Sequence, residues 1–179
     1  MTLEQAFVVA DKASHDLKTF DCGKTGMNDF LSRFAIKHNK LGLSRTWVLP
    51  EVVSKANTET APTDSKKTIA AYFTLSTATV SREAIPAQHS LPTYPIPVIM
   101  LARLAIDSKY QGQGLGAKTL VTALRQARTL SQSGLPAYGL ILDVLDEQAL
   151  GFYNSFEVFQ PFTDEPMRLF VGMKTLSDL

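Results

Sequence analysis

The fold is indicated most clearly by residues 98–116, which read Val98-Ile-Met-Leu-Ala-Arg-Leu-Ala-Ile106-Asp-Ser-Lys-Tyr-Gln111-Gly-Gln-Gly-Leu-Gly116. Residues 98–106 are apolar except for Arg103, which predicts a central β-strand covered on both faces. Three glycines then alternate with other residues, and apolar positions at helical spacing predict a helix from Gly116 to Leu130. Backbone amides at a helix N-terminus are unpaired and lie at the positive end of the helix dipole. The stretch therefore predicts a binding site for phosphate or pyrophosphate.

The residues around this stretch predict a mixed β-sheet flanked by helices, an α/β fold. A turn at 21–26 is followed by apolar residues at helical spacing, with a stop signal at Gly42. Runs of β-branched and aromatic residues predict further strands at 44–53, 68–80, 138–145, 157–162 and 167–173, and a third predicted helix covers 146–155. Pro50 predicts that the strand 44–53 lies at a sheet edge or is broken.

Length and composition favour a single domain over 1–179, since the chain has 179 residues, of which 45% are hydrophobic, and a formal net charge of +1. Segment 54–66 has no large apolar residue, and we expect a flexible loop there. The single cysteine, Cys22, fits a reducing cytoplasm. The N-terminus does not resemble a signal peptide, and no apolar run is long enough to span a membrane. The three histidines lack metal-ligand spacing, so we expect no metal site.

Two common phosphate-binding patterns fit poorly. The P-loop needs Gly-Lys-Ser/Thr in succession, whereas residues 116–119 read Gly-Ala-Lys-Thr, one position out of register. The dinucleotide pattern is met by Gly112, Gly114 and Ala117, with Asp143 near the end of the next strand. However, the five-residue loop before the first glycine is too long for that fold. Only 36 residues follow Asp143, too few for its second half.

A third pattern, Gln/Arg-x-x-Gly-x-Gly/Ala, is met by Gln111, Gly114 and Gly116. Here the chain resembles the GNAT family of N-acetyltransferases, from Phe20 onward. The resemblance implies a GNAT-like acyl-CoA N-acyltransferase fold and acetyl-CoA as the cofactor. It implies that the strand before the loop lends backbone groups to the pantetheine arm, and that the loop binds the pyrophosphate. The implied binding residues are Leu104, Ala105 and Ile106 in the strand, and Gln111, Gly112, Gln113, Gly114, Leu115 and Gly116 in the loop.

A tyrosine follows an aromatic residue in the predicted helix 146–155, as is common in GNAT enzymes. The resemblance implies that this residue, Tyr153, is catalytic and lies near the cofactor sulfur. A phenol has a pKa of about 10 and a thiol of about 8.5, so Tyr153 helps chiefly by hydrogen-bonding the developing thiolate. Alternatively, Tyr153 is one aromatic residue on the buried face of a short helix. The family usually places Gly-Phe after this helix, whereas this chain has Glu157-Val158, which predicts a different local backbone.

One GNAT subgroup is particularly similar, the acetyltransferase toxins of bacterial type II toxin–antitoxin pairs. The similarity lies in residues 20–31 with Ala35, in residues 104–106 and in the ending Leu169-Phe170. It implies acetylation of the α-amine of aminoacyl-tRNA, which blocks translation, a small ribbon-helix-helix antitoxin, and a homodimer. An α-amine, with a pKa of about 7.7–8.0 against about 10.4 for lysine, is partly neutral at pH 7 and needs only a weak base.

Binding of tRNA needs basic residues on the surface. Segment 24–45 carries five basic residues and one acid, and within it we single out Lys37 and Arg45 as candidate RNA contacts. An ordinary solvated helix face is the alternative. Arg103 is the most unusual charge because it lies inside an apolar strand. It either faces the substrate cleft and contacts RNA, or forms a buried pair with a carboxylate such as Asp107 or Asp143.

Two other functions stay open from the sequence. The chain is either an acetyltransferase of a small amine, an antibiotic or a protein N-terminus, or a non-catalytic acyl-CoA-binding regulatory module. A module that only binds acyl-CoA has no use for the hydroxyl of Tyr153, so the two classes differ in their response to its removal.

Overall fold

The computed structural model describes residues 2–52, 65–86 and 90–178. The predicted loop 54–66 lies outside the described residues except at 65–66. The chain forms two compact units, the first made of Met1–Thr74 with Arg103–Thr122 and the second of Leu75–Ala102 with Ala123–Leu179. Strands β5 (Lys67–Val80) and β6 (Ile96–Ile106) and helix α3 (Leu115–Gln132) contribute residues to both units. The single-domain organisation stays a prediction.

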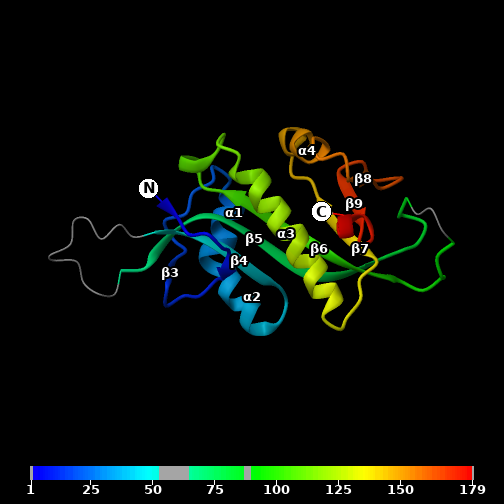
Figure 1. Ribbon diagram of the computed structural model, residues 1–179, viewed down its shortest axis with the longest axis horizontal. Coiled ribbons are helices and arrows are strands. Elements are labelled where there is room, and N and C mark those ends of the chain that lie inside the picture. The colour runs from blue at the N-terminus through cyan, green and yellow to red at the C-terminus, as the bar shows by residue number, and fades with distance from the viewer. Residues whose placement is uncertain (1, 53–64, 87–89, 179) are drawn as a thin grey trace. The chain divides into compact units, whose positions relative to one another are not determined.

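The strands form a mixed sheet in the order β1-β4-β5-β6-β7-β9-β8, with β2 paired to β4 and β3 paired to β5 (Figure 1). Pairing is parallel between β6 and β7 and antiparallel between β7 and β9. The mixed α/β sheet predicted from the sequence is therefore confirmed. The remaining strands are β1 (Thr2–Leu3), β2 (Val8–Val9), β3 (His15–Asp16), β4 (Arg45–Val52), β7 (Gly139–Asp143), β8 (Gln160–Pro161) and β9 (Arg168–Gly172).

Pro50 neither breaks β4 nor marks a sheet edge, contrary to the expectation from its position. β4 runs without interruption to Val52 and lies between β5 and the short strands β1 and β2. The Pro50 carbonyl accepts the N–H of Glu4 at 3.0 Å, just after β1 has ended at Leu3. Continuing the register of β1, Glu4 lies opposite Pro50, and such a pair normally exchanges two ladder bonds. Because proline has no N–H, the pair keeps only this one bond, and β1 ends at Leu3.

The helical segment of the first unit begins after the turn at 21–24. It consists of α1 (Thr25–Asp29), a π-helical stretch η1 (Phe30–Phe34) and α2 (Ala35–Leu41). Gly42 ends the segment in the left-handed conformation, with φ 70°, and the N–H of Leu43 bonds the carbonyl of His38 at 3.0 Å. The helix and its glycine stop were predicted correctly, but apolar spacing alone does not reveal the π turn.

The core of the first unit gathers around Tyr72, which is fully buried. Its ring packs edge-on against Phe20 at 5.3 Å, and its hydroxyl donates to the carbonyl of Met27 at 2.8 Å. Burial raises the pKa of Tyr72, so the hydroxyl stays a donor. The same cluster contains Ala10, Leu17, Cys22, Phe30, Leu31, Ala35, Val48, Ile69 and Ala105. This core fixes the helical segment against β4, β5 and the end of β6.

The second unit packs β7 and β9 around its own cluster, which includes Ile141, Phe162 and Phe170. Short 3₁₀ helices are η3 (Ser108–Tyr110) in the first unit and η4 (Thr175–Asp178) in the second. Helix α4 (Glu147–Asn154) follows β7. Within the described residues, no helix combines the length and apolar character needed to cross a membrane.

The backbone of Gly139 lies against β9 so closely that any side chain there meets immovable atoms. A Cβ added at this position would collide with the ring of Phe170 and the carbonyl oxygen of Val171. Overpacking of this kind costs about 1–3 kcal/mol. We expect Gly139→Ala to lower the free energy of unfolding, measured by urea titration, by about 2 kcal/mol.

Gly151 in α4 provides the matched control, since an added Cβ meets nothing within 4 Å. Alanine is the better helix former, so Gly151→Ala should raise the free energy of unfolding by up to about 1 kcal/mol. Equal stabilities of the two variants would contradict the close approach at Gly139.

Candidate functional site

The glycine loop connects β6 to α3 through two left-handed residues. Gly112 has φ 72° and Gly114 has φ 80°, a region that side chains other than glycine rarely adopt. A Cβ at either position meets nothing within 4 Å, so the need for glycine is one of backbone conformation and not of space. Gly116 lies inside the first turn of α3. The loop predicted from the sequence is therefore built as a sharp change of direction from strand to helix.

The glycine loop leads into the N-terminus of a long helix. The first N–H groups of α3 have no acceptor within the helix, as at every helix N-terminus. The helical bonding of α3 begins with the N–H of Lys118, which donates to Gly114 at 3.3 Å. Gln111 to Gly114 are exposed to solvent. Unpaired amides at the N-terminus of a long helix form a site for an anion such as a pyrophosphate.

Gln111 uses its side chain within the protein. Its Nε2 donates to the carbonyl of Cys22 at 3.0 Å and to the carbonyl of Ile106 at 2.9 Å. Both amide hydrogens are thereby occupied, so only its backbone and its Oε1 face outward. Gln113 is similar, with Nε2 donating to the carbonyl of Lys109 at 2.9 Å. The loop therefore offers backbone groups, and not these side-chain donors, to a ligand.

The three residues before the loop form the end of β6. Ala105 is buried, while Leu104 and Ile106 are half-buried. Pairing with β7 is recorded at Ile99 and Met100, and β6 continues beyond it to Ile106. On the β5 side, the N–H of Asp107 still donates to the carbonyl of Ala70 at 2.9 Å. The role of residues 104–106 in holding a pantetheine arm stays a prediction.

Tyr153 lies in the second unit, on helix α4, with its side chain 9% exposed. Its ring packs edge-on against Phe152 at 5.2 Å and Phe159 at 5.8 Å. No described residue forms a hydrogen bond with the hydroxyl, whose oxygen keeps access to solvent. Burial raises the pKa of Tyr153 to about 12. The residue thus combines a fixed ring with a neutral, unpartnered donor, although its ring packing also fits a structural role.

The two ends of α4 are held by different means. Asp146 caps the N-terminus, its carboxylate accepting the N–H of Ala149 at 2.9 Å. After the helix, Glu157 takes the left-handed conformation with φ 56°. The sequence predicted a different local backbone because this position lacks the glycine that is usual in the family. That prediction is wrong in one respect, since Glu157 itself adopts the left-handed conformation that a glycine usually takes.

Arg103 lies over the ring of Phe30, with its guanidinium carbon 4.3 Å from the ring centroid. This cation–π contact holds the charge against the first-unit core. Both carboxylates proposed as its partner have other bonds. Asp143 binds Arg168 at 2.6 Å, and Asp107 accepts backbone N–H groups from Asp21 and Lys109.

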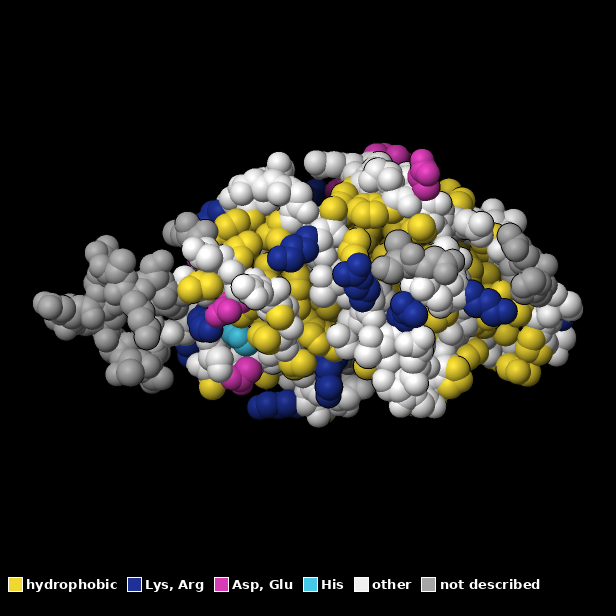
Figure 2. Space-filling view, viewed as in Figure 1, with side chains coloured by type: hydrophobic (Ala, Val, Ile, Leu, Met, Phe, Trp, Pro, Cys, Tyr) yellow, Lys and Arg dark blue, Asp and Glu magenta, His cyan; other side chains and the backbone are white. Residues whose placement is uncertain are grey.

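Lys37 and Arg45 are both exposed, Lys37 on α2 and Arg45 at the start of β4. Figure 2 shows Lys and Arg side chains on the face in view, separated by uncharged ones. A contact between these residues and RNA stays a prediction.

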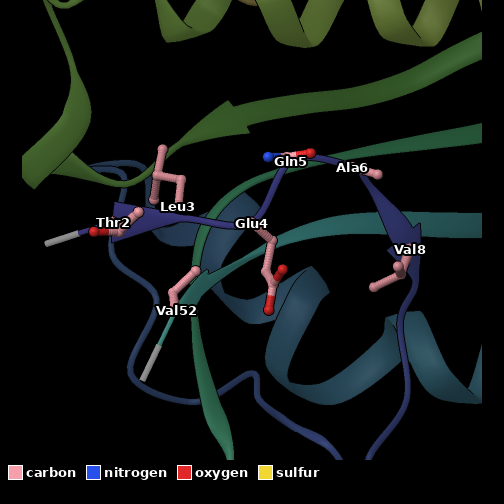
Figure 3. Close-up of a pocket in the computed structure, with 7 residues that line it drawn as sticks. All are labelled: Thr2, Leu3, Glu4, Gln5, Ala6, Val8 and Val52. Carbon is pink, nitrogen blue, oxygen red and sulfur yellow. The ribbon is translucent and has the colours of Figure 1, made fainter. Parts of the chain in front are cut away.

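An open pocket of about 390 Å³ is lined by residues near the N-terminus and by Val52, and no residue of the glycine loop lines it (Figure 3). Its charged group, the Glu4 carboxylate, is bonded to Lys67 Nζ at 2.7 Å. A site for a pyrophosphate needs donors, and this lining offers a carboxylate, so the pocket is a poor candidate. It is lined by Thr2, Leu3, Glu4, Gln5, Ala6, Val8 and Val52.

Comparison with known proteins gives a consistent picture, although no family model matches the chain. A tRNA-acetylating toxin of Mycobacterium tuberculosis is 28% identical over 162 residues, covering 89% of this chain and 87% of that protein. Among solved structures, AtaTR bound with AcCoA is 30% identical, with a TM-score of 0.77 and coverage of 96% and 95%. AtaT complexed with acetyl-methionyl-tRNAfMet is 29% identical, with a TM-score of 0.80 and coverage of 96% of both chains. A mutant AtaT toxin bound to the C-terminus of the antitoxin AtaR and acetyl-CoA is 27% identical, with a TM-score of 0.76 and coverage of 96% and 95%.

The left-handed backbone at Glu157 gives a stability prediction for the helix that carries Tyr153. A left-handed residue other than glycine costs about 1–2 kcal/mol, part of which glycine returns through its greater freedom in the unfolded chain. We expect Glu157→Gly to raise the free energy of unfolding by about 0.5 kcal/mol. Asn154→Gly, on the right-handed last turn of α4, should lower it by about 0.5 kcal/mol. The same sign for both variants in thermal and urea unfolding would refute this reading of the helix end.

Proposed function

This chain belongs to the GNAT-fold toxins that acetylate aminoacyl-tRNA, and we propose that it transfers the acetyl group of acetyl-CoA to the α-amine of a charged tRNA. The observation that carries the proposal is the glycine loop, in which the left-handed Gly112 and Gly114 lead into the N-terminus of the 18-residue helix α3. The likeness of this chain to AtaTR bound with AcCoA extends over 96% of its length. Acetylated aminoacyl-tRNA has no free α-amine for peptide-bond formation, so translation stops.

The glycine loop fits the pyrophosphate of the cofactor. Two linked phosphates carry negative charge, and the loop presents several N–H donors at the positive end of an 18-residue helix. We assign the pyrophosphate to the backbone of residues 111–116, and the pantetheine arm to backbone groups of residues 104–106. Because the donors belong to the backbone, the chain needs no large positive charge for this task, in agreement with a net charge of +1.

Tyr153 is suited to the departure of the sulfur. Acetyl-CoA supplies a thioester whose carbonyl carbon an amine can attack, so that a C–N bond forms while the C–S bond breaks. With its pKa raised to about 12, the Tyr153 hydroxyl does not hand its proton fully to a thiolate of pKa about 8.5. It donates a hydrogen bond to the developing charge instead, and the unpartnered state of the hydroxyl leaves it free to do so. The proton released by the amine passes to solvent.

The proposed partners follow from the same family. An antitoxin would hold the enzyme inactive, and we propose that it is of the ribbon-helix-helix type. We further propose a homodimer that acts in the cytoplasm, where charged tRNA is found. Lys37, Arg45 and Arg103 are the proposed RNA contacts, the first two because they are exposed and Arg103 because it lies in β6, the strand that leads into the glycine loop.

Removal of the Tyr153 hydroxyl tests the proposal directly. With charged tRNA and acetyl-CoA, we expect Tyr153→Phe to lower kcat about 100-fold, the usual effect of removing one donor to a developing anion. The KM for acetyl-CoA should change little, since the ring packing is retained. Tyr138→Phe is the control, because Tyr138 is half-buried, stacks on Phe170 at 5.9 Å and lies in the same unit. Turnover that is unchanged in Tyr153→Phe would remove Tyr153 from the mechanism, and no acetylation by the unaltered enzyme would end the proposal.

The pH dependence of the reaction distinguishes the two groups involved. An α-amine loses its proton with a pKa of about 7.7–8.0, so kcat/KM for charged tRNA should rise up to about pH 8. A tyrosine with its pKa raised to about 12 stays protonated throughout this range, so the rate should then stay level up to about pH 9.5. Initial rates must be corrected for hydrolysis of the aminoacyl ester. A falling limb below pH 9.5 that is absent in Tyr153→Phe would contradict a neutral Tyr153.

A further inference from the structure

The glycine loop is held by hydrogen bonds to a turn that lies almost ninety positions earlier in the chain. Ser108 donates twice to the carbonyl of Asp21, from its N–H at 2.9 Å and from its hydroxyl at 2.8 Å. The carbonyl of Cys22 accepts from Gln111 Nε2 at 3.0 Å. In the opposite direction, the N–H of Asp21 donates to Asp107 Oδ2 at 3.0 Å. The turn 21–23 and the segment 107–111 are therefore docked by one backbone–backbone bond and three bonds between side chains of the segment and the backbone of the turn.

Asp107 is the centre of this docking. Its side chain is 4% exposed, and its two oxygens accept the N–H groups of Asp21 and Lys109, each at 3.0 Å. Its own N–H donates to the carbonyl of Ala70 on β5, and its carbonyl accepts from Tyr110 at 2.8 Å. A buried carboxylate that accepts charge-assisted bonds fixes both groups strongly. Asp107 thereby ties β5, the turn 21–23 and η3 together at the entrance to the glycine loop.

Asn28 braces the turn from the other side. It lies in α1, and its amide donates to Asp21 Oδ1 at 2.7 Å while its Oδ1 accepts the N–H of Cys22 at 3.0 Å. Asp21 Oδ1 also accepts the N–H of Gly23 at 2.9 Å. These bonds close the turn on itself, so Asn28 determines where the carbonyls that receive Ser108 and Gln111 are placed. Asn28 therefore acts on the glycine loop indirectly, through the turn 21–23.

We propose that Asp107 and Asn28 are positioning residues for acetyl-CoA, which hold the pyrophosphate-binding amides in place through the turn 21–23. This inference rests on the proposed function for the identity of the ligand. The bonds within the loop, from Gln111 to Ile106 and from Gln113 to Lys109, hold its shape, while the bonds to the turn 21–23 fix its position in the first unit. The turn fixes this position through Asp107, Ser108 and Gln111. Loss of either positioning residue loosens the loop and weakens cofactor binding without removing any group that touches the cofactor.

The test measures the binding of CoA alone by titration calorimetry on the full chain, so that neither tRNA nor catalysis is needed. Asp107→Asn leaves one acceptor oxygen for two N–H groups, and Asn28→Ala removes all three side-chain bonds to the turn, since Asn28 Oδ1 also accepts from Cys22 Sγ at 3.2 Å. Each variant should raise the Kd for CoA about tenfold, which corresponds to about 1.4 kcal/mol. Because both act through the same turn, the double variant should be weaker than either single variant by much less than the product of the two effects.

Asp11→Asn is the matched control. Asp11 lies in the same unit, and its carboxylate also accepts backbone N–H groups within a turn, from Ala13 at 3.3 Å and Ser14 at 3.1 Å. It should leave the Kd for CoA unchanged. A second readout is the steady-state reaction, in which the KM for acetyl-CoA should rise about tenfold in Asn28→Ala. The kcat at saturating acetyl-CoA and the KM for the amine should stay near their original values.

The outcomes separate the inference from the proposed function. If the unaltered protein does not bind CoA, the proposed function fails and the inference fails with it. If the unaltered protein binds CoA and both variants, folded by thermal melting, bind it equally well, the inference alone is overturned. Should Asp107→Asn not fold, Asn28→Ala decides the matter, because Asn28 is only half-buried. Full additivity in the double variant would overturn the shared route through the turn.

Discussion

The constraint on which the site depends is that the first backbone N–H groups of helix α3 have no acceptor within the helix. Amides in this state are costly when buried and useful when exposed, and here the segment from Gln111 to Gly114 is exposed. Their direction follows from Gly112 and Gly114, whose left-handed backbone turns the chain from β6 into α3. An anion completes the hydrogen bonding that the fold leaves open. Binding strength at such a site comes from dipoles and geometry, which a nearly neutral chain can supply.

The two proposed chemical tasks lie in opposite environments. The loop 111–114, which we propose binds the pyrophosphate, is exposed to solvent, whereas the ring of Tyr153 is buried against Phe152 and Phe159. Burial raises the pKa of that tyrosine, which makes it a poorer acid but a more reliable neutral donor. The environment thus favours stabilisation of a leaving thiolate by a hydrogen bond over complete proton transfer. The loop residues are exposed in the first unit, and the pKa of Tyr153 is raised by burial in the second.

The sequence predicted the long elements well because their signals are long. The apolar run ending at Ile106, the helix from Gly116 and the glycine stop at Gly42 all appear where the patterns placed them. The strands β1 to β3 were missed because two residues cannot show a period. Pro50 misled because the effect of its missing N–H depends on the neighbouring strand. The sequence does not show that this neighbour, β1, has only two residues and ends opposite the proline. The left-handed Glu157 was missed because the usual signal for that conformation is a glycine.

Site prediction had a similar limit, since a motif specifies residue types and not their partners. Gln111 is the first residue of the pattern and was expected to bind the cofactor, yet its amide donates to the carbonyls of Cys22 and Ile106. The pattern accepts glutamine or arginine at this position, and these two side chains differ in charge. What they share is a planar end with several N–H donors, which suits two carbonyl acceptors. A direct contact with a pyrophosphate would favour the charged residue strongly, so the tolerance of glutamine is better explained by an inward, positioning role.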